Sequence, residues 1–320
     1  MDAELSRSAA RWQVTSALAF CPPFPVLSRF AILPEMLAKV SQLTVLSPGL
    51  LGSSVARAVR ARKMAERIVV WAHRAERRKE LVGQPWCDEV CETPEQAVKG
   101  ASLVVLAAPV DAILPLLRSV APGLRHGAIV TDVGSVKAPI AREGHVAVGS
   151  HAYFVGSHPM AGSEKTSWEH GTATFFEGRA CFVTPLPETA RVASEAVADF
   201  WRRLGMEVTI LGPEKHDEIV AHISHLPMVL ASALCSLLAS KDPSWGSYAG
   251  GGLRDTTRVA GSDPRIWRPI LEQNSEQVLR ALRGYQDELK LLDAAITGGD
   301  WGKVTAILER ARAFRDGIRK

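Results

Sequence analysis

The chain lacks the features that mark several classes of protein. Its 320 residues contain only five cysteines, and because these are scattered and odd in number they indicate no disulfide framework and favour a reducing, cytoplasmic compartment. The formal net charge is only +4, which gives no argument for nucleic-acid binding. No apolar run has transmembrane length, and no repeat or low-complexity tract is present. The mildly basic balance instead suits an anionic small substrate or a phosphate-bearing cofactor.

The sequence also gives little support for a metal centre. Cys87 and Cys91 lie close together, but no second Cys/His pair has the spacing of a zinc site. His222 and His225 are spaced to share one helix face, yet His216 does not align with them and no carboxylate completes the set. We therefore expect no metal ion, and we interpret these histidines as core or substrate-facing residues.

The pattern of apolar segments changes near Pro213. Before it, short apolar runs alternate with helical patterns, which is typical of a parallel α/β sheet. After it, only helical patterns follow, with a kink expected at Pro227 and a loop at glycines 250–252. Residues 1–40 have no clear periodicity, so we expect either a poorly ordered extension or a translation start assigned too far upstream.

A glycine-containing turn follows the first apolar run. Residues 43–46 have the character of a strand, residues 53–59 that of a helix, and Gly49-Leu50-Leu51-Gly52 lies between them. Strand, glycine turn and helix form the context of a dinucleotide fingerprint. Gly49 would let the backbone approach a pyrophosphate, and Gly52 would let the helix pack on the strand. The N–H groups of this turn would attract the phosphates. The segment 41–212 is therefore expected to be a dinucleotide-binding domain with a Rossmann-type, doubly wound parallel sheet.

Two positions depart from the usual dinucleotide fingerprint. Ser47 stands where its first glycine is expected, which would carry a modest conformational cost. At the end of the second strand, where an acidic residue would bind a ribose, the chain has His73 and Arg74. Arg74 is the best candidate for binding a 2′-phosphate, whereas residues 77–79 are interpreted as solvated charges. The sequence thus favours NADP as cofactor, with NAD as the alternative.

Two further strand ends offer cofactor contacts. The apolar run 102–106 is typical of a strand buried on both faces, and it ends near Ala108 and Pro109, where a cofactor could lie close. The run 128–133 leads to Ser135. Ser135 is predicted to N-cap the next helix, to place its hydroxyl in the cofactor crevice, or to do both.

His158 is the most informative single residue. The run 153–155 predicts a strand, and the glycines and proline that follow place His158 on a loop just beyond its end. Ligands bind beyond the carboxyl ends of strands in open α/β sheets. A histidine there, near Glu164 and Lys165, is placed for proton chemistry. The alternative is a histidine that merely caps the strand end.

Arg258 lies among apolar residues in the helical part of the chain, a setting that predicts burial. A buried arginine needs an anionic partner. A substrate carboxylate is one option, and Asp255, at i,i+3 spacing, is the other.

Taken together, these residues resemble the prephenate/arogenate dehydrogenases of tyrosine biosynthesis. The likeness runs from Leu43 to the end of the helical domain and is carried by ordered segments at Asp132–Lys137, Gly156–Glu164, His216-Asp217, Ser224–Pro227 and Asp255–Pro264. The resemblance implies oxidative decarboxylation of prephenate to 4-hydroxyphenylpyruvate, with hydride transfer to a nicotinamide cofactor. Arogenate, giving tyrosine, is the alternative substrate. It also implies that residues 213–320 form an all-α substrate and dimerisation domain, so we expect a homodimer.

The resemblance also implies roles for single residues. His158 would take the proton of the substrate 4-hydroxyl, with Ser135 assisting at the same hydroxyl or positioning the nicotinamide. Substrate contacts are implied at Arg258, His225, Glu164 and Ser163. His216 is interpreted as structural, paired with Asp217.

Two other functions are alternatives to this one. A β-hydroxy-acid dehydrogenase would use a lysine in the helical domain, but from His216 onward none occurs before Lys241. A non-catalytic dinucleotide sensor is favoured only by Ser47. The presence of His158 and Ser135 together with Arg258 argues against a sensor, which needs no base.

Overall fold

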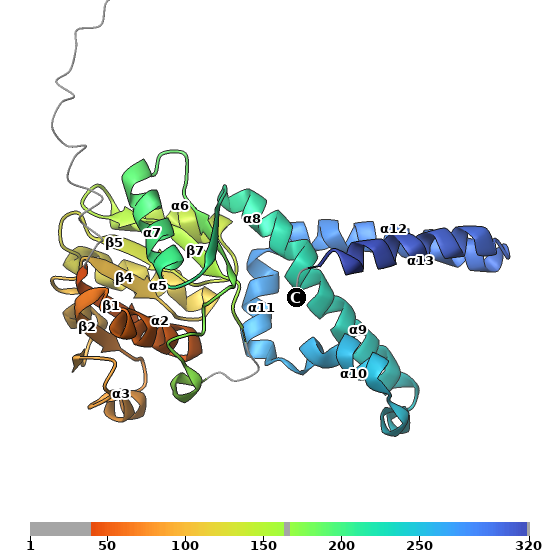
Figure 1. Ribbon diagram of the computed structural model, residues 1–320, viewed down its shortest axis with the longest axis horizontal. Helices are drawn as coiled ribbons and strands as arrows, with labels where there is room; N and C mark the ends of the chain where they lie inside the picture. Colours follow the sequence, from red (N-terminus) through yellow and green to blue (C-terminus); the bar gives the residue numbers. More distant parts are fainter. Residues whose placement is uncertain (1–39, 163–166, 319–320) are drawn as a thin grey trace, which may run out of the picture.

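The computed structural model describes residues 40–162 and 167–318 (Figure 1). The predictions for the N-terminal extension, and those for Ser163 and Glu164, therefore concern residues outside the described part of the chain, apart from Val40.

A six-stranded parallel sheet forms the centre of the first domain, in the order β3-β2-β1-β4-β5-β6. Its strands are β1 (Val40–Leu46), β2 (Ala65–Trp71), β3 (Glu89–Val90), β4 (Leu103–Leu106), β5 (Ile129–Asp132) and β6 (Tyr153–Phe154). β4 and β5 are buried throughout because helices cover both faces of the sheet. The predicted doubly wound parallel sheet is confirmed.

Helices pack on the two faces of this sheet around separate hydrophobic clusters. One cluster joins α2 (Leu50–Ala61), α3 (Ala75–Leu81) and α7 (Arg191–Arg203) to the sheet. The other joins α4 (Pro94–Val98), α5 (Val110–Val120) and α6 (Ala138–Val148). After β1 the chain continues to β2, which pairs with one edge of β1. It later crosses to β4, which pairs with the other edge of β1, so the direction of strand order reverses at this point. This reversal opens a crevice at the carboxyl ends of β1 and β4.

A second, three-stranded sheet corrects the prediction of a loop at His158. It contains β7 (Gly156–Pro159), β8 (Ala180–Thr184) and β9 (Glu207–Ile210), with β7 antiparallel to β8. His158 lies within β7, opposite Phe182. Pro159 is tolerated because β7 is an edge strand. Gly156 is needed there because a Cβ would lie 2.6 Å from Oγ1 of Thr184.

The second domain begins with a long helical stretch that contains one irregular turn. α8 (Pro213–Val220) continues through a π-helical turn, η3 (Ala221–His225), into α9 (Leu226–Lys241). The irregularity thus precedes Pro227, where a kink was predicted. Pro227 lies in the first turn of α9, where a missing N–H is tolerated.

The remaining described residues of this domain are also helical. The further helices are α10 (Gly251–Thr257), η5 (Arg258–Gly261), α11 (Pro264–Gln273), α12 (Ser275–Thr297) and α13 (Trp301–Asp316). The predicted glycine loop is wrong, because Gly250 is the N-cap of α10 and the next two glycines form its first turn. Gly is accepted at an N-cap. α12 and α13 lie side by side and project away from the sheets (Figure 1).

Much of the apolar surface of the helical domain is exposed in the single chain. Exposed large side chains include Leu237, Tyr248, Leu291, Trp301, Leu308 and Phe314. Contrary to the expectation from the sequence, the stretch Pro213–Lys241 is long and apolar enough, by length and composition alone, to cross a membrane. Its beginning, however, carries buried polar residues that contact the first domain, as described next.

Candidate active site

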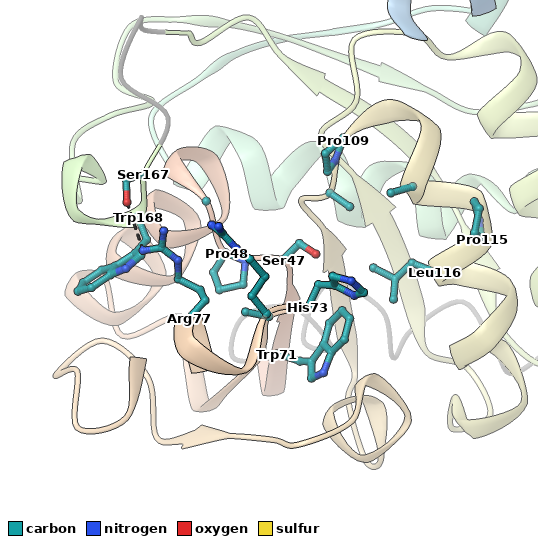
Figure 2. Close-up of a pocket in the computed structure, with 15 residues that line it drawn as sticks. Ser47, Pro48, Trp71, His73, Arg77, Pro109, Pro115, Leu116, Ser167 and Trp168 are labelled. Carbon is teal, nitrogen blue, oxygen red and sulfur yellow. Dashed lines mark hydrogen bonds between the residues drawn. The ribbon is translucent and has the colours of Figure 1, made fainter. Parts of the chain in front are cut away.

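A cavity of about 620 Å³ occupies the crevice at the carboxyl ends of β1, β2 and β4 (Figure 2). The predicted cofactor residues that line it are Gly49, His73, Arg74, Ala108 and Pro109. Trp71, Ser167 and Trp168 also line it, and none of these was singled out from the sequence. Its walls carry apolar and cationic side chains and no carboxylate among the described residues.

The start of α2 has the properties of a phosphate site. Its helical ladder begins with Ser53 N donating to Gly49 O at 3.0 Å, so the N–H groups of Leu50 and Leu51 have no partner within the helix. No side chain of a described residue caps this end, and no acidic residue lies in its first turn. A Cβ at Gly52 would lie 2.8 Å from the Cβ of Ala107, so glycine permits the close packing of helix and strand. These features fit a dinucleotide pyrophosphate.

Ser47 adopts a backbone conformation that favours glycine. Its φ is 64°, in the left-handed region, which costs a non-glycine residue about 1 kcal/mol. The turn is nevertheless formed, with Ser47 N donating to Trp71 O and Gly49 N donating to Ser47 O, both at 2.8 Å.

Among the cations near the second strand, Arg74 is available to a ligand. Arg77 forms an ion pair with Glu80 at 2.8 Å, and Arg78 forms one with Glu92 at 3.1 Å. The side chain of Arg74 is exposed, lines the cavity, and forms no hydrogen bond or ion pair with any residue that the structure describes.

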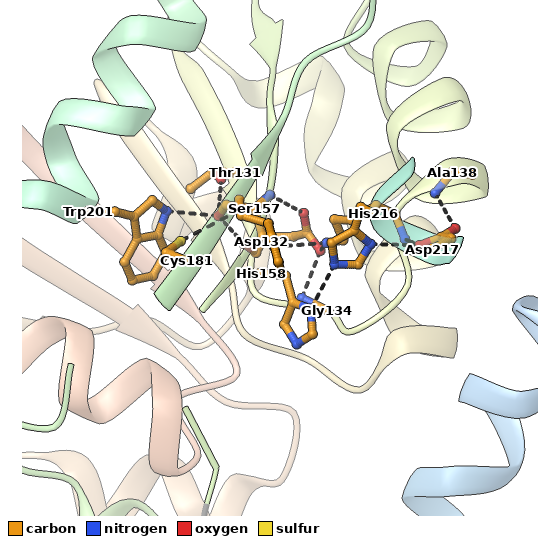
Figure 3. A network of polar contacts seen from close by, with 12 residues as sticks. Thr131, Asp132, Gly134, Ala138, Ser157, His158, Cys181, Trp201, His216 and Asp217 are labelled. Carbon is orange, nitrogen blue, oxygen red and sulfur yellow. Dashed lines mark hydrogen bonds and ion pairs between the residues drawn. The ribbon is translucent and has the colours of Figure 1, made fainter. Parts of the chain in front are cut away.

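His158 belongs to a buried chain of hydrogen bonds (Figure 3). Its Nδ1 lies 2.9 Å from Nε2 of His216, and Nδ1 of His216 lies 2.8 Å from Oδ1 of Asp217. The carboxylate of Asp217 in turn accepts the backbone N–H groups of Lys137 and Ala138, each at 2.8 Å. These donors at the start of α6 stabilise its negative charge.

This chain assigns the ring protons of both histidines. A carboxylate can only accept, so Nδ1 of His216 carries a proton that it donates to Asp217. In a neutral ring Nε2 of His216 must then accept, and Nδ1 of His158 donates to it. The lone pair of His158 is therefore on Nε2, where it is free to receive a proton from a ligand.

The surroundings keep His158 neutral near pH 7. Burial is the main cause that lowers its pKa well below the usual value, and positive charge on His216, Lys137 and His225 acts in the same direction. Burial also lowers the pKa of His216, against the opposing effect of the hydrogen bond to Asp217. A neutral imidazole is the form that can act as a base.

A buried ion pair fixes the strand that carries His158. Lys137 and Asp132, both fully buried, form this pair, and Nζ of Lys137 also donates to the carbonyl of Ser157 at 2.9 Å. Asp132 accepts the N–H of Gly134 at 2.8 Å and that of Ser157 at 3.2 Å. The pair thus joins β5 to β7. Burial lowers the pKa of Lys137, and Asp132 opposes that shift.

His225 is buried near this chain, but its predicted neighbour on the helix is not. His222 is exposed and bonds to the carbonyl of Glu218 at 2.8 Å. The predicted shared face is wrong because the π turn changes the spacing of side chains around the helix. Within residues 40–162 and 167–318, no group of three His, Cys, Asp or Glu side chains could hold a metal ion.

Two predicted residues are placed differently from expectation. Ser135 is half-buried after β5, but the N-cap of α6 is Lys137, so the capping prediction is wrong. A turn intervenes before the helix begins. Arg258 is exposed in η5 and pairs neither with Asp255 nor with any other described residue. The predicted burial is therefore wrong for the single chain, because η5 packs against α9, in which no residue after Ala231 is buried.

Comparison with known proteins identifies relatives over most of the chain. The family model of the prephenate dehydrogenase nucleotide-binding domain matches residues 55–210, and that of the prephenate dehydrogenase dimerization domain matches residues 212–310. Cyclohexadienyl dehydrogenase of Zymomonas mobilis is 31% identical over 262 residues, covering 81% of this chain and 89% of the relative.

Solved structures give the same result. Prephenate dehydrogenase from Aquifex aeolicus, in complex with hydroxyphenyl propionate and NAD+, superposes with a TM-score of 0.82 at 29% identity, covering 87% of this chain and 98% of the other. Synechocystis arogenate dehydrogenase superposes with a TM-score of 0.76 at 28% identity, covering 86% and 99%.

Proposed function

Because the chain belongs to the prephenate dehydrogenase family, we propose that it catalyses the oxidative decarboxylation of prephenate to 4-hydroxyphenylpyruvate in tyrosine biosynthesis. The observation that carries the proposal is the buried His158–His216–Asp217 chain, which leaves a proton-accepting nitrogen on His158. Arogenate, converted to tyrosine, is the alternative substrate, since one structural relative is an arogenate dehydrogenase.

The chemistry requires a base at the hydroxyl-bearing carbon. A nicotinamide cofactor, when bound, supplies the hydride acceptor. Nε2 of His158 takes the hydroxyl proton as the C–H bond at C4 breaks, and the hydroxyl oxygen becomes a carbonyl. Carbon dioxide then leaves, and the electron pair of the broken C–C bond passes through the ring to that carbonyl oxygen, which takes up a proton and becomes the phenol of the aromatic product. The positive charge gained by His158 is stabilised through His216 by the carboxylate of Asp217. Ser135, beyond the end of β5, would assist at the same hydroxyl or position the nicotinamide.

We place the cofactor in the β1/β4 crevice, with its pyrophosphate at the start of α2. NADP is favoured, because the side chain of Arg74 lines the cavity without a described partner and none of the described lining residues carries a carboxylate that could bind a ribose hydroxyl. NAD is the alternative, since the Aquifex relative was solved with NAD+.

The helical domain, from residue 213 onward, would bind substrate and form a homodimer. Its family model is described as a dimerization domain, and its exposed apolar side chains offer a surface for a second copy. Arg258 would bind a substrate carboxylate through two N–H donors once the helical domain is packed in the dimer. His225, Ser163 and Glu164 complete the proposed substrate contacts. A cytoplasmic location is part of the proposal, supported by the free thiols of all the described cysteines.

The test is a two-by-two assay of purified protein, with prephenate or arogenate as substrate and NAD or NADP as cofactor. Formation of reduced cofactor is followed by absorbance. We expect turnover with prephenate and NADP to be the fastest combination. Faster turnover with arogenate would show that arogenate, and not prephenate, is the substrate. A folded protein without activity in all four assays would overturn the proposed function in favour of a dinucleotide sensor.

A further inference from the structure

We propose that Asn274 is a positioning residue that fixes the ring of His225, so that the helical domain presents a hydrogen-bond donor to an acceptor oxygen of the substrate. Asn274 lies at the junction of α11 and α12 and received no role from the sequence. The inference rests on the proposed function only in taking the ligand to be the substrate.

The amide of Asn274 can be oriented without ambiguity. Its Nδ2 lies 2.9 Å from the backbone carbonyl of Asp217. A carbonyl only accepts, so the nitrogen of the amide, and not its oxygen, must face it. The same Nδ2 lies 3.2 Å from Nδ1 of His225. Its second proton therefore points to that ring nitrogen, and Asn274 is buried, which holds the arrangement in place.

The orientation of Asn274 fixes the tautomer of His225. Nδ1 accepts from the amide, so in the neutral ring Nε2 carries the proton. Burial, the first cause, lowers the pKa of His225 to about 4, so the ring is neutral at pH 7. His225 and His158 thus offer opposite groups at the same ring atom, a donor at His225 and an acceptor at His158.

We assign Nε2 of His225 to a ligand because no described protein group accepts its proton. The side chain is fully buried, and Nε2 has no hydrogen-bond partner among the described residues. A buried donor left without a partner is costly, so we infer that an acceptor atom of the ligand meets it. Hydrogen bonds link His225 through Asn274 to Asp217, and Asp217 through His216 to His158. Both rings therefore belong to one site.

The N–H donor of His225 determines which kind of substrate group can bind beside it. A keto or carboxylate oxygen can accept the bond, whereas the ammonium of an amino acid has only donors. The geometry therefore favours an oxygen acceptor against His225 and disfavours a substrate that places its ammonium there.

The direct test is the ring tautomer in the full-length protein without substrate. Histidine labelled with ¹⁵N is observed through long-range ¹H–¹⁵N couplings at pH 7, and the His225 signals are assigned by their loss in His225→Gln. We expect Nε2 of His225 to be protonated and Nδ1 not. In Asn274→Asp, whose carboxylate can only accept, the proton should move to Nδ1. A wild-type ring protonated at Nδ1 would overturn the proposal.

A kinetic pair tests the donor and does not depend on the folding of the Asn274 variant. His225→Gln keeps an amide N–H near the position of Nε2, whereas His225→Phe fills the space without a donor. With whichever substrate the enzyme turns over, we expect KM to rise less than about tenfold for Gln and by about tenfold to a hundredfold for Phe. An equal rise of KM in the two variants would contradict the proposed donor role of His225. Absence of turnover with either substrate would refute the proposed function, while the spectra would still decide the tautomer.

Discussion

At the scale of single residues, His158 combines a free Nε2 lone pair with a ring that resists protonation. Because burial lowers its pKa below the usual 6.5, the ring is neutral, and able to accept a proton, above that lowered value. We expect kcat/KM to stay level as the pH falls through 6.5 and to decline only at lower pH. The measurement is a pH–rate profile, with circular dichroism at each pH to exclude unfolding. An acid limb at or above pH 6.5 would contradict the burial argument.

Ser47 is strained where glycine would be relaxed. Ser47→Gly should raise the free energy of unfolding by about 1 kcal/mol and should tighten cofactor binding, since it also removes a side chain from the cavity wall. Lys63 is the matched control, because it is exposed, has a φ of 53° and does not line the cavity. Lys63→Gly should stabilise similarly without changing the cofactor Kd. Denaturant unfolding and calorimetric titration measure both effects, and an unchanged stability of Ser47→Gly would refute the strain.

Arg74 is the proposed reader of the 2′-phosphate. Arg74→Ala should raise KM for NADP roughly tenfold or more and leave KM for NAD within about threefold, because only NADP loses a charge-assisted contact. Lys79→Ala removes an exposed cation from the same helix but outside the cavity wall, and should change neither value. Equal losses for both cofactors in Arg74→Ala would argue for a general charge effect instead.

Some site residues could be predicted from the sequence and others could not. Gly49 and Arg74 were found because apolar runs mark strand ends, and parallel strands bring their carboxyl ends to one edge. The partnership of His158 with His216 was missed, since it joins residues far apart in the chain. Asn274 gave no signal either, because an asparagine at a helix junction is ordinary and only the fold brings it to His225.

At the scale of elements, the alternating direction of side chains along β7 determines where its residues lie. Ser157 and His158 point to opposite sides of the strand, as neighbours in a strand must. Ser157 bonds to Trp201 at 2.9 Å and to Thr131 at 2.8 Å, whereas His158 faces His216 (Figure 3). The sequence suggested a loop because Gly and Pro usually interrupt strands. An edge strand tolerates both, and its pairing with β8 is a long-range contact.

The buried ion pair that holds β7 gives a stability prediction. Lys137→Met leaves Asp132 buried without its cation and should lower the free energy of unfolding by about 3 kcal/mol or more. Arg142→Ala breaks an ion pair with Glu214 in which the two side chains are 62% and 54% exposed, and should cost less than about 1 kcal/mol. Urea unfolding of both variants provides the comparison. Similar losses in the two would show that burial of the pair is not what matters.

At the scale of the whole molecule, the site joins the two domains. β7 supplies His158, α8 and η3 supply His216, Asp217 and His225, and the start of α6 holds the carboxylate. The sequence predicted the doubly wound sheet and the helical domain correctly, because period and order of apolar segments reflect burial. It did not reveal which faces of the helices are exposed to solvent in the single chain, so Arg258 was expected to be buried.

The central claim is that His158 is the base of an oxidative decarboxylation. The most direct measurement compares wild type and His158→Asn in reduced-cofactor formation at saturating substrate, with His222→Asn as a control at an exposed histidine. Loss of a general base should lower kcat by roughly two to four orders of magnitude with little change in KM, and the control should keep wild-type activity. Full activity in folded His158→Asn would contradict the account.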